Sequence, residues 1–113
     1  MGIDFYIGTS QIKLTNAYWY NEFLNWVSVE GEYPHILNHS PIHGSYTLDE
    51  GETAADLYAG SVIRLKQEVE DLLSHTPPDF CKYVLTQMLK GCNIATNKRV
   101  KITMDNGHWE GDE

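Results

Sequence analysis

The chain has 113 residues, 42% of them hydrophobic, and it carries three Trp, seven Tyr and three Phe. This length accommodates one domain of ordinary size and leaves no room for two. The aromatic content excludes a disordered chain. Sixteen acidic side chains against eight basic ones give a net charge of −8.

The negative charge is concentrated in the first half of the chain. Residues 1–60 contain eight acids and a single base, Lys13. A nucleic-acid backbone requires Lys and Arg to displace its counterions, so we expect no direct nucleic-acid binding. The acidic half instead favours a protein partner with a basic surface, because complementary fields speed encounter. Solubility is the alternative explanation of the same charge.

The only cysteines are Cys81 and Cys92, and their spacing matches no metal knuckle or redox motif. So few thiols in a small chain suggest a reducing compartment. The first residues lack a basic segment followed by an apolar run, so we expect no signal peptide. No apolar run is long enough to span a membrane. We therefore expect a cytoplasmic protein without a membrane segment.

The N-terminus reads as a strand, because Ile3, Phe5 and Ile7 alternate with more polar residues. A turn at residues 8–10 follows, and a weaker alternation around Ile12 and Leu14 suggests a hairpin partner.

Asn16 is a suitable N-cap for a first helix that ends near residue 28. Trp19, Phe23 and Trp26 recur at helical spacing, so we predict that they form its buried face. Tyr18 lies off that face.

A long irregular stretch, residues 30–52, follows the first helix, with a short strand expected at 46–48. The second helix is expected to begin after Thr53 and to end near His75. Its apolar residues repeat at alternating steps of four and three: Tyr58, Val62, Leu65, Val69 and Leu72.

The third helix is expected to start after the Pro pair at 77–78 and to end at Gly91, with Phe80, Val84 and Met88 inward. Residues 99–105 alternate cleanly, as in a final strand. This order predicts a single α+β domain over residues 1–113. Its small, mostly antiparallel sheet is formed by the N- and C-terminal strands and is packed against about three helices. The acidic segment 105–113 is expected to form a tail.

His35, His39 and His43 are spaced by four residues each. On a helix this spacing would stack three metal ligands on one face, but Pro41 and Gly44 argue against a helix here. In a loop the three could still converge on a metal, with His75 or a carboxylate as the fourth ligand. Three partly exposed loop histidines are the alternative, and we assign no metal or other cofactor.

No catalytic motif is recognisable. Phosphate-binding glycine patterns and the nucleophile elbow are both absent. Cys81 would stand in the first turn of the third helix with His75 six residues upstream, a weak basis for a thiol nucleophile. The alternative is a small buried residue between helices. We assign no catalytic residue.

The favoured interpretation is a non-enzymatic acidic binding or inhibitor module that occludes a basic surface of a protein partner, such as one that handles nucleic acid. In size and composition alone it resembles immunity proteins for nuclease toxins and phage inhibitors of bacterial defence. A protein that sequesters a small molecule and a His-cluster metal protein are the alternatives. The proposed contact residues are carboxylates and tyrosines: Glu30, Glu32, Tyr33, Tyr46, Asp49, Glu50, Glu52, Asp56 and Tyr18.

Overall fold

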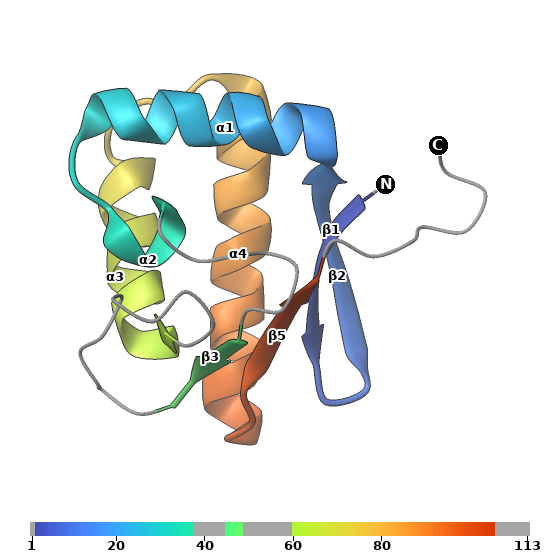
Figure 1. Cartoon of the computed structure of the whole chain (residues 1–113). Coiled ribbons are helices and arrows are strands. Elements are labelled where there is room, and N and C mark those ends of the chain that lie inside the picture. Colours follow the sequence, from blue (N-terminus) through green and yellow to red (C-terminus); the bar gives the residue numbers. More distant parts are fainter. Residues whose placement is uncertain (1, 38–44, 49–59, 106–113) are drawn as a thin grey trace.

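Helices and strands are combined in one layered arrangement, so the predicted α+β class is confirmed (Figure 1). The computed structural model describes residues 2–37, 45–48 and 60–105. Its elements in chain order are β1 (Gly2–Ile7), β2 (Ser10–Asn16), α1 (Ala17–Glu30), α2 (Pro34–Leu37), β3 (Ser45–Thr47), β4 (Gly60–Ser61), α3 (Val62–Leu73), α4 (Asp79–Lys98) and β5 (Ile102–Asp105).

The five strands form one sheet in the order β2-β1-β5-β3-β4. β1 pairs antiparallel with both β2 and β5, so the N- and C-terminal strands are neighbours as predicted. β3 pairs antiparallel with β5 but parallel with β4. The sheet is therefore mixed, and the prediction of a mostly antiparallel sheet was wrong. β4 has only two residues, too few for the alternation from which a strand is predicted.

The N-terminal hairpin has the predicted form. Ile7 pairs with Ser10 across a two-residue turn, and Gly8 adopts a φ of 61°, a region that glycine enters at little cost. Ile3, Phe5 and Ile7 are buried on the inner face of β1.

α1 begins at the predicted cap, and of the three residues predicted to be buried, Phe23 is fully buried, Trp26 is partly buried and Trp19 is exposed. The Asn16 side chain accepts a hydrogen bond of 2.9 Å from the backbone N–H of Trp19. The buried residues are Tyr20, Phe23 and Val27, whereas Trp19 is 43% exposed. Because Asn16 is both the last residue of β2 and the cap of α1, the hairpin fixes the rotation of the helix. In this rotation Tyr20, Phe23 and Val27 face the core.

α3 has the predicted inner face, with Val62, Leu65, Val69 and Leu72 all buried. The helix starts at Val62, where the Ser61 side chain accepts a hydrogen bond from a first-turn N–H. The prediction of a helix that begins after Thr53 was wrong in its start, because Gly60–Ser61 form strand β4 directly before the helix; Thr53 and Tyr58 themselves lie outside the described residues.

α4 continues beyond the predicted stop at Gly91 and ends only at Lys98, so that boundary was wrong. Gly91 is buried where the helix meets β1. Arg99, in the left-handed conformation with φ 58°, terminates the helix.

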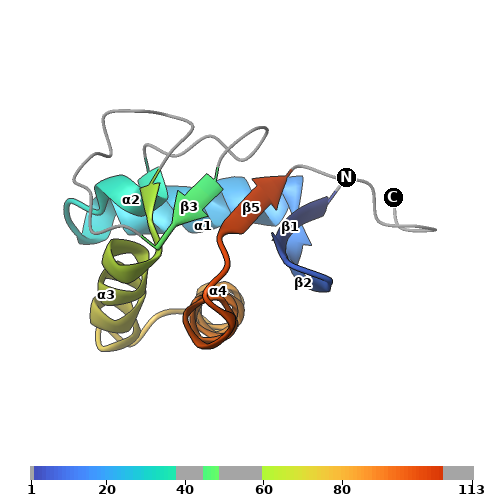
Figure 2. The ribbon, with the colours of Figure 1, turned by 90° about the horizontal axis from the view of Figure 1, so that it is seen from below.

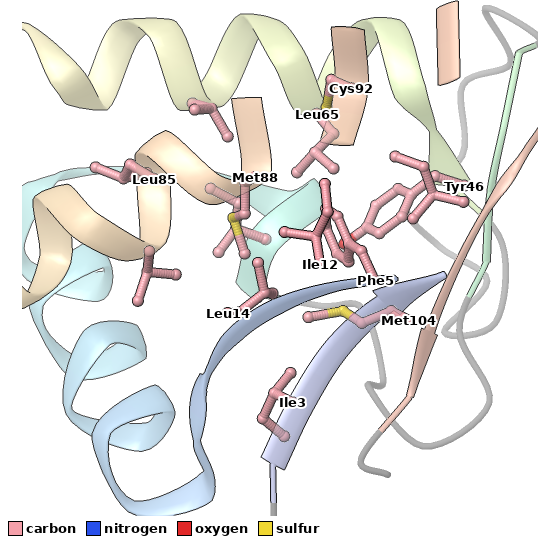
Figure 3. Close-up of a cluster of buried hydrophobic side chains, with 14 of the residues drawn as sticks. Ile3, Phe5, Ile12, Leu14, Tyr46, Leu65, Leu85, Met88, Cys92 and Met104 are labelled. Atoms are coloured by element: carbon pink, nitrogen blue, oxygen red, sulfur yellow. The ribbon is translucent and has the colours of Figure 1, made fainter. Parts of the chain in front are cut away.

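Figure 2 shows α3 and α4 on one face of the sheet. The buried hydrophobic cluster draws its residues from both helices and from the strands of the sheet. α1 packs against β2 and α4, and α2 is a single turn against α3, so the described residues contain four helices, close to the predicted number of about three. Figure 3 shows Phe5 and Tyr46 reaching into this core from the sheet, toward Leu65 and Cys92. Over the described ranges, no helix is long and apolar enough to cross a bilayer.

Candidate functional site

Tyr33 lies where the end of α1 meets α2 and α3. Gly31, with a φ of 155°, ends α1 and allows the chain to turn. The Tyr33 side chain is thereby directed onto α3, where its hydroxyl donates a 2.6 Å hydrogen bond to Oδ2 of Asp71. This hydrogen bond, together with burial and the charges of Asp71, Glu30 and Glu68, raises the pKa of Tyr33 to about 12. The charged groups acting on this hydroxyl are carboxylates.

His75, in the turn between α3 and α4, connects two of these carboxylates. Its Nδ1 is 2.9 Å from Oε1 of Glu30, and its Nε2 is 3.6 Å from Oδ2 of Asp71. The imidazole also stands edge-on to the Tyr33 ring, with 6.3 Å between the ring centres. Glu32 is exposed beside them. We call Glu30, Glu32, Tyr33, Asp71 and His75 the acidic corner.

The acidic corner presents charge to solvent. The Asp71 side chain is 59% exposed and that of Glu30 is 27% exposed. An open groove of about 260 Å³ runs beside them, lined by Gly31, Glu32, Tyr33, Pro34 and Leu37. Its walls combine apolar surface with a single carboxylate, so it suits the stem and charged head of a long basic side chain.

A second carboxylate–imidazole pair joins α2 to α3, with His35 buried and Glu68 mostly buried. Glu68 Oε2 is 3.0 Å from His35 Nδ1 and accepts a 3.1 Å hydrogen bond from the His35 backbone N–H. Its Oε1 accepts a further bond from the Ile36 N–H. Glu68 thus satisfies the free donors at the start of α2 and fixes that turn on α3. Burial raises the pKa of Glu68 against the opposing effect of these hydrogen bonds.

Of the three histidines considered as metal ligands, the structure describes only His35. His35 is oriented by Glu68, as metal-binding imidazoles often are, and within the described part of the chain its buried Nε2 has no hydrogen-bond partner. His39 and His43 lie outside the described residues. Among the residues that the structure does describe, no three His, Cys, Asp or Glu side chains are grouped to hold a metal ion.

Both thiols belong to the core. Cys81 and Cys92 are fully buried and unbridged. Burial raises the pKa of Cys81 to about 11 and that of Cys92 to about 12, which disfavours the nucleophilic thiolate. His75 pairs with Glu30. The structure favours the reading of Cys81 as a packing residue.

The structure brings together three of the predicted contact residues, Glu30, Glu32 and Tyr33. Tyr18 is 63% exposed near the opposite end of α1. Tyr46 was wrongly placed at the surface: its ring is fully buried, and its hydroxyl donates to the His35 carbonyl at 2.8 Å. A tyrosine can be buried in this way because the one polar group that it carries into the core finds an acceptor. The remaining candidates lie outside the described residues: Asp49, Glu50, Glu52 and Asp56.

Sequence reasoning missed Asp71, and it considered His75 only as a metal ligand or base. Asp71 lies in the last turn of α3 and His75 follows four residues later, just beyond the helix end, a spacing at which side chains can meet on one side of the chain. That signal was present, but Glu30 is 45 residues from His75, and no periodicity reveals such a contact. No family model, curated protein or solved structure matches this chain.

Proposed function

We propose that this domain is a non-enzymatic binding module that covers a basic surface of a protein partner, with the acidic corner as its contact. The observation that carries the proposal is the grouping of two partly exposed carboxylates, Glu30 and Asp71, at 2.9 and 3.6 Å from the His75 ring, with the exposed Glu32 beside them. Carboxylates held this close together repel one another, and an approaching Lys or Arg relieves that repulsion.

The groove supports a protein partner over a small ligand. Its volume of about 260 Å³ is below the roughly 300–1,000 Å³ of usual small-molecule pockets. One Lys or Arg side chain would fit it, with the aliphatic stem against Pro34 and Leu37 and the charged head at Glu32. Tyr33 is only 7% exposed and its hydroxyl already donates to Asp71, so we assign it the role of orienting that carboxylate. Direct contact with the partner is left to Glu32, Glu30 and Asp71.

The partner we envisage handles nucleic acid, and its phosphate-binding surface would be covered by carboxylates that imitate phosphates. Immunity proteins for nuclease toxins and phage inhibitors of bacterial defence work in this way as classes. The net charge of −8 and the small size of the chain support the comparison.

A charge-reversal pair tests the proposal. Glu32→Lys alters the acidic corner, whereas Glu70→Lys makes the same charge change at another exposed site on α3. The immobilised parent and both variants are exposed to cytosol of the native host at low and high salt. At low salt we expect the parent and Glu70→Lys to retain the same host protein, and Glu32→Lys to lose it. High salt should release this protein from the parent as well.

Thermal unfolding provides the folding control, since exposed charges contribute little to stability. Equal retention by Glu32→Lys and the parent would show that the corner is not the contact. Native mass spectrometry of the purified protein adds an independent check: a bound metal ion or small ligand in place of a polypeptide would contradict the proposal.

A further inference from the structure

α1 has a second face that its packing leaves uncovered. Tyr18, Glu22, Asn25 and Val29 follow one another at i, i+4, i+7 and i+11, on the side opposite the buried residues. We call these four residues the α1 stripe. Tyr18 is 63% exposed and Val29 is 81% exposed. These large apolar side chains sit on the solvent face of an amphipathic helix, where polar residues are usual.

The aromatic end of the stripe is held in place by α4. The Trp19 ring stands edge-on to Tyr18, with 5.1 Å between ring centres. The same ring packs at 5.1 Å on Phe80, in the first turn of α4. A ring fixed in this way loses little side-chain entropy when a partner covers it, which is typical of the aromatic anchors of interfaces.

The charged side chains of α1 are all negative. α1 contains no Lys or Arg, and its only charged residues are Glu22 and Glu30. Figure 1 shows α1 crossing one end of the molecule and leading directly into the turn before α2. The stripe is therefore continuous with the acidic corner, because Glu30 ends α1 and Glu32 follows it.

We propose that the α1 stripe is the docking surface for a positively charged amphipathic helix of the partner, which lies along α1 and reaches the acidic corner. This inference rests on the proposed function and adds the form of the partner. From Tyr18 to Val29 the stripe spans roughly 16 Å at the helical rise of about 1.5 Å per residue. That is about three turns, enough for the ridges of two helices to interlock. Apolar residues of the partner helix would cover Tyr18 and Val29, and its flanking Lys and Arg would meet Glu22, Glu30 and Glu32.

The test uses a synthetic peptide of Leu and Lys, about 18 residues long, with its apolar residues at helical spacing. A peptide of the same composition in scrambled order has equal charge but no apolar face. Binding is measured by calorimetry and by Trp fluorescence, to which the half-exposed Trp19 contributes. We expect the parent to bind the amphipathic peptide in low salt at least about tenfold more tightly than the scrambled one.

Tyr18→Ser leaves the net charge unchanged and should weaken the amphipathic peptide at least about tenfold. Tyr83→Ser is the matched control, because Tyr83 is 55% exposed and belongs to α4, outside the four residues of the stripe. It should bind as the parent does. Equal binding of both peptides by the parent, or equal binding of the amphipathic peptide by parent and Tyr18→Ser, would overturn the inference.

Two further outcomes separate this inference from the proposed function. If Glu32→Lys loses the peptide and Tyr18→Ser keeps it, the acidic corner stands and the α1 stripe fails. If Tyr18→Ser loses it and Glu32→Lys keeps it, the stripe stands and the corner fails. A second copy of this chain is the other possible occupant of the stripe, and sedimentation of the parent tests for it. A dimer that Tyr18→Ser dissociates would assign the stripe to that second copy and overturn the inference of a partner helix.

Discussion

Gly91 of α4 lies against the ring of Phe5 in β1, so closely that a Cβ atom at Gly91 would stand 2.7 Å from Phe5 Cδ2. Real Cβ atoms do not approach other atoms to this distance. The absence of a side chain at Gly91 is therefore what allows α4 to pack closely on the sheet. From the sequence alone a glycine at this place predicts the end of a helix, but here it permits contact between a helix and a strand.

Gly91→Ala should lower the free energy of unfolding by about 1–3 kcal/mol, the usual cost of overpacking a core. Helical propensity acts in the opposite direction, since Ala stabilises a helix interior by about 1 kcal/mol over Gly. Urea unfolding measures the balance. The Gly91→Ala substitution should cost less stability in a Phe5→Leu background than in the parent, because the shorter side chain leaves room for the added methyl group. A more stable Gly91→Ala would show that the helix is not held against Phe5.

Tyr33→Phe should destabilise the fold by about 1 kcal/mol. A hydrogen bond to a charged group contributes about 1.5–3 kcal/mol, but Asp71 is 59% exposed and would be partly rehydrated. A double-mutant cycle with Asp71→Asn isolates the interaction, and Tyr18→Phe serves as an exposed control. Additive effects of the two substitutions would mean that the 2.6 Å contact adds no stability.

Glu68 should make stability depend on pH in a defined direction. Burial raises its pKa in the folded state above the ordinary value of 4.5, so the folded protein binds the proton more tightly than the unfolded chain. The stabilising contribution is complete below about pH 4.5 and is lost as the pH rises through the raised value. Relative to Glu68→Gln, the unfolding free energy of the parent should fall over this range. A rise would show that the hydrogen bonds from α2 outweigh burial.

Both cysteines should be protected from thiol reagents while the protein is folded. Their raised pKa values, about 11 for Cys81 and about 12 for Cys92, leave almost no thiolate near neutral pH, and both side chains are fully buried. An aromatic disulfide reagent should modify neither thiol in native buffer within minutes and both in urea. Rapid labelling of Cys81 without denaturant would reopen the interpretation as a nucleophile.

The features that could be predicted from sequence are those set by neighbouring residues. The alternation in β1, the Asn16 cap and the buried stripe of α3 each depend on a few adjacent positions. The buried face of α1 was predicted only in part, at Phe23 and less completely at Trp26, because two stripes with helical spacing lie side by side on the helix. Which stripe faces the core is decided by the hairpin, because β2 ends at Asn16 and so fixes where α1 begins and how it is rotated.

The candidate site shows the same division. A run of carboxylates and tyrosines was visible between residues 30 and 33, and those residues do lie together. Their partners Asp71 and His75 come from the far end of another helix, and only tertiary packing brings them near. Tyr46 illustrates the converse: polar neighbours in sequence suggested exposure, but the fold supplies its hydroxyl with a backbone acceptor in the core.

The position of β1 between β2 and β5 has a consequence for how the chain folds. Its partner on one side is reached through a two-residue turn, whereas its partner on the other side, in the pairing of Asp4 with Asp105, is about a hundred residues away. Closing so long a loop costs more entropy than closing a hairpin, and distant pairings slow folding. The hairpin and the α3–α4 pair should therefore form early as local units. The pairing of β1 with β5 should limit the folding rate, so mutations in these two strands where they pair should slow folding. Mutations elsewhere in the sheet should mainly speed unfolding.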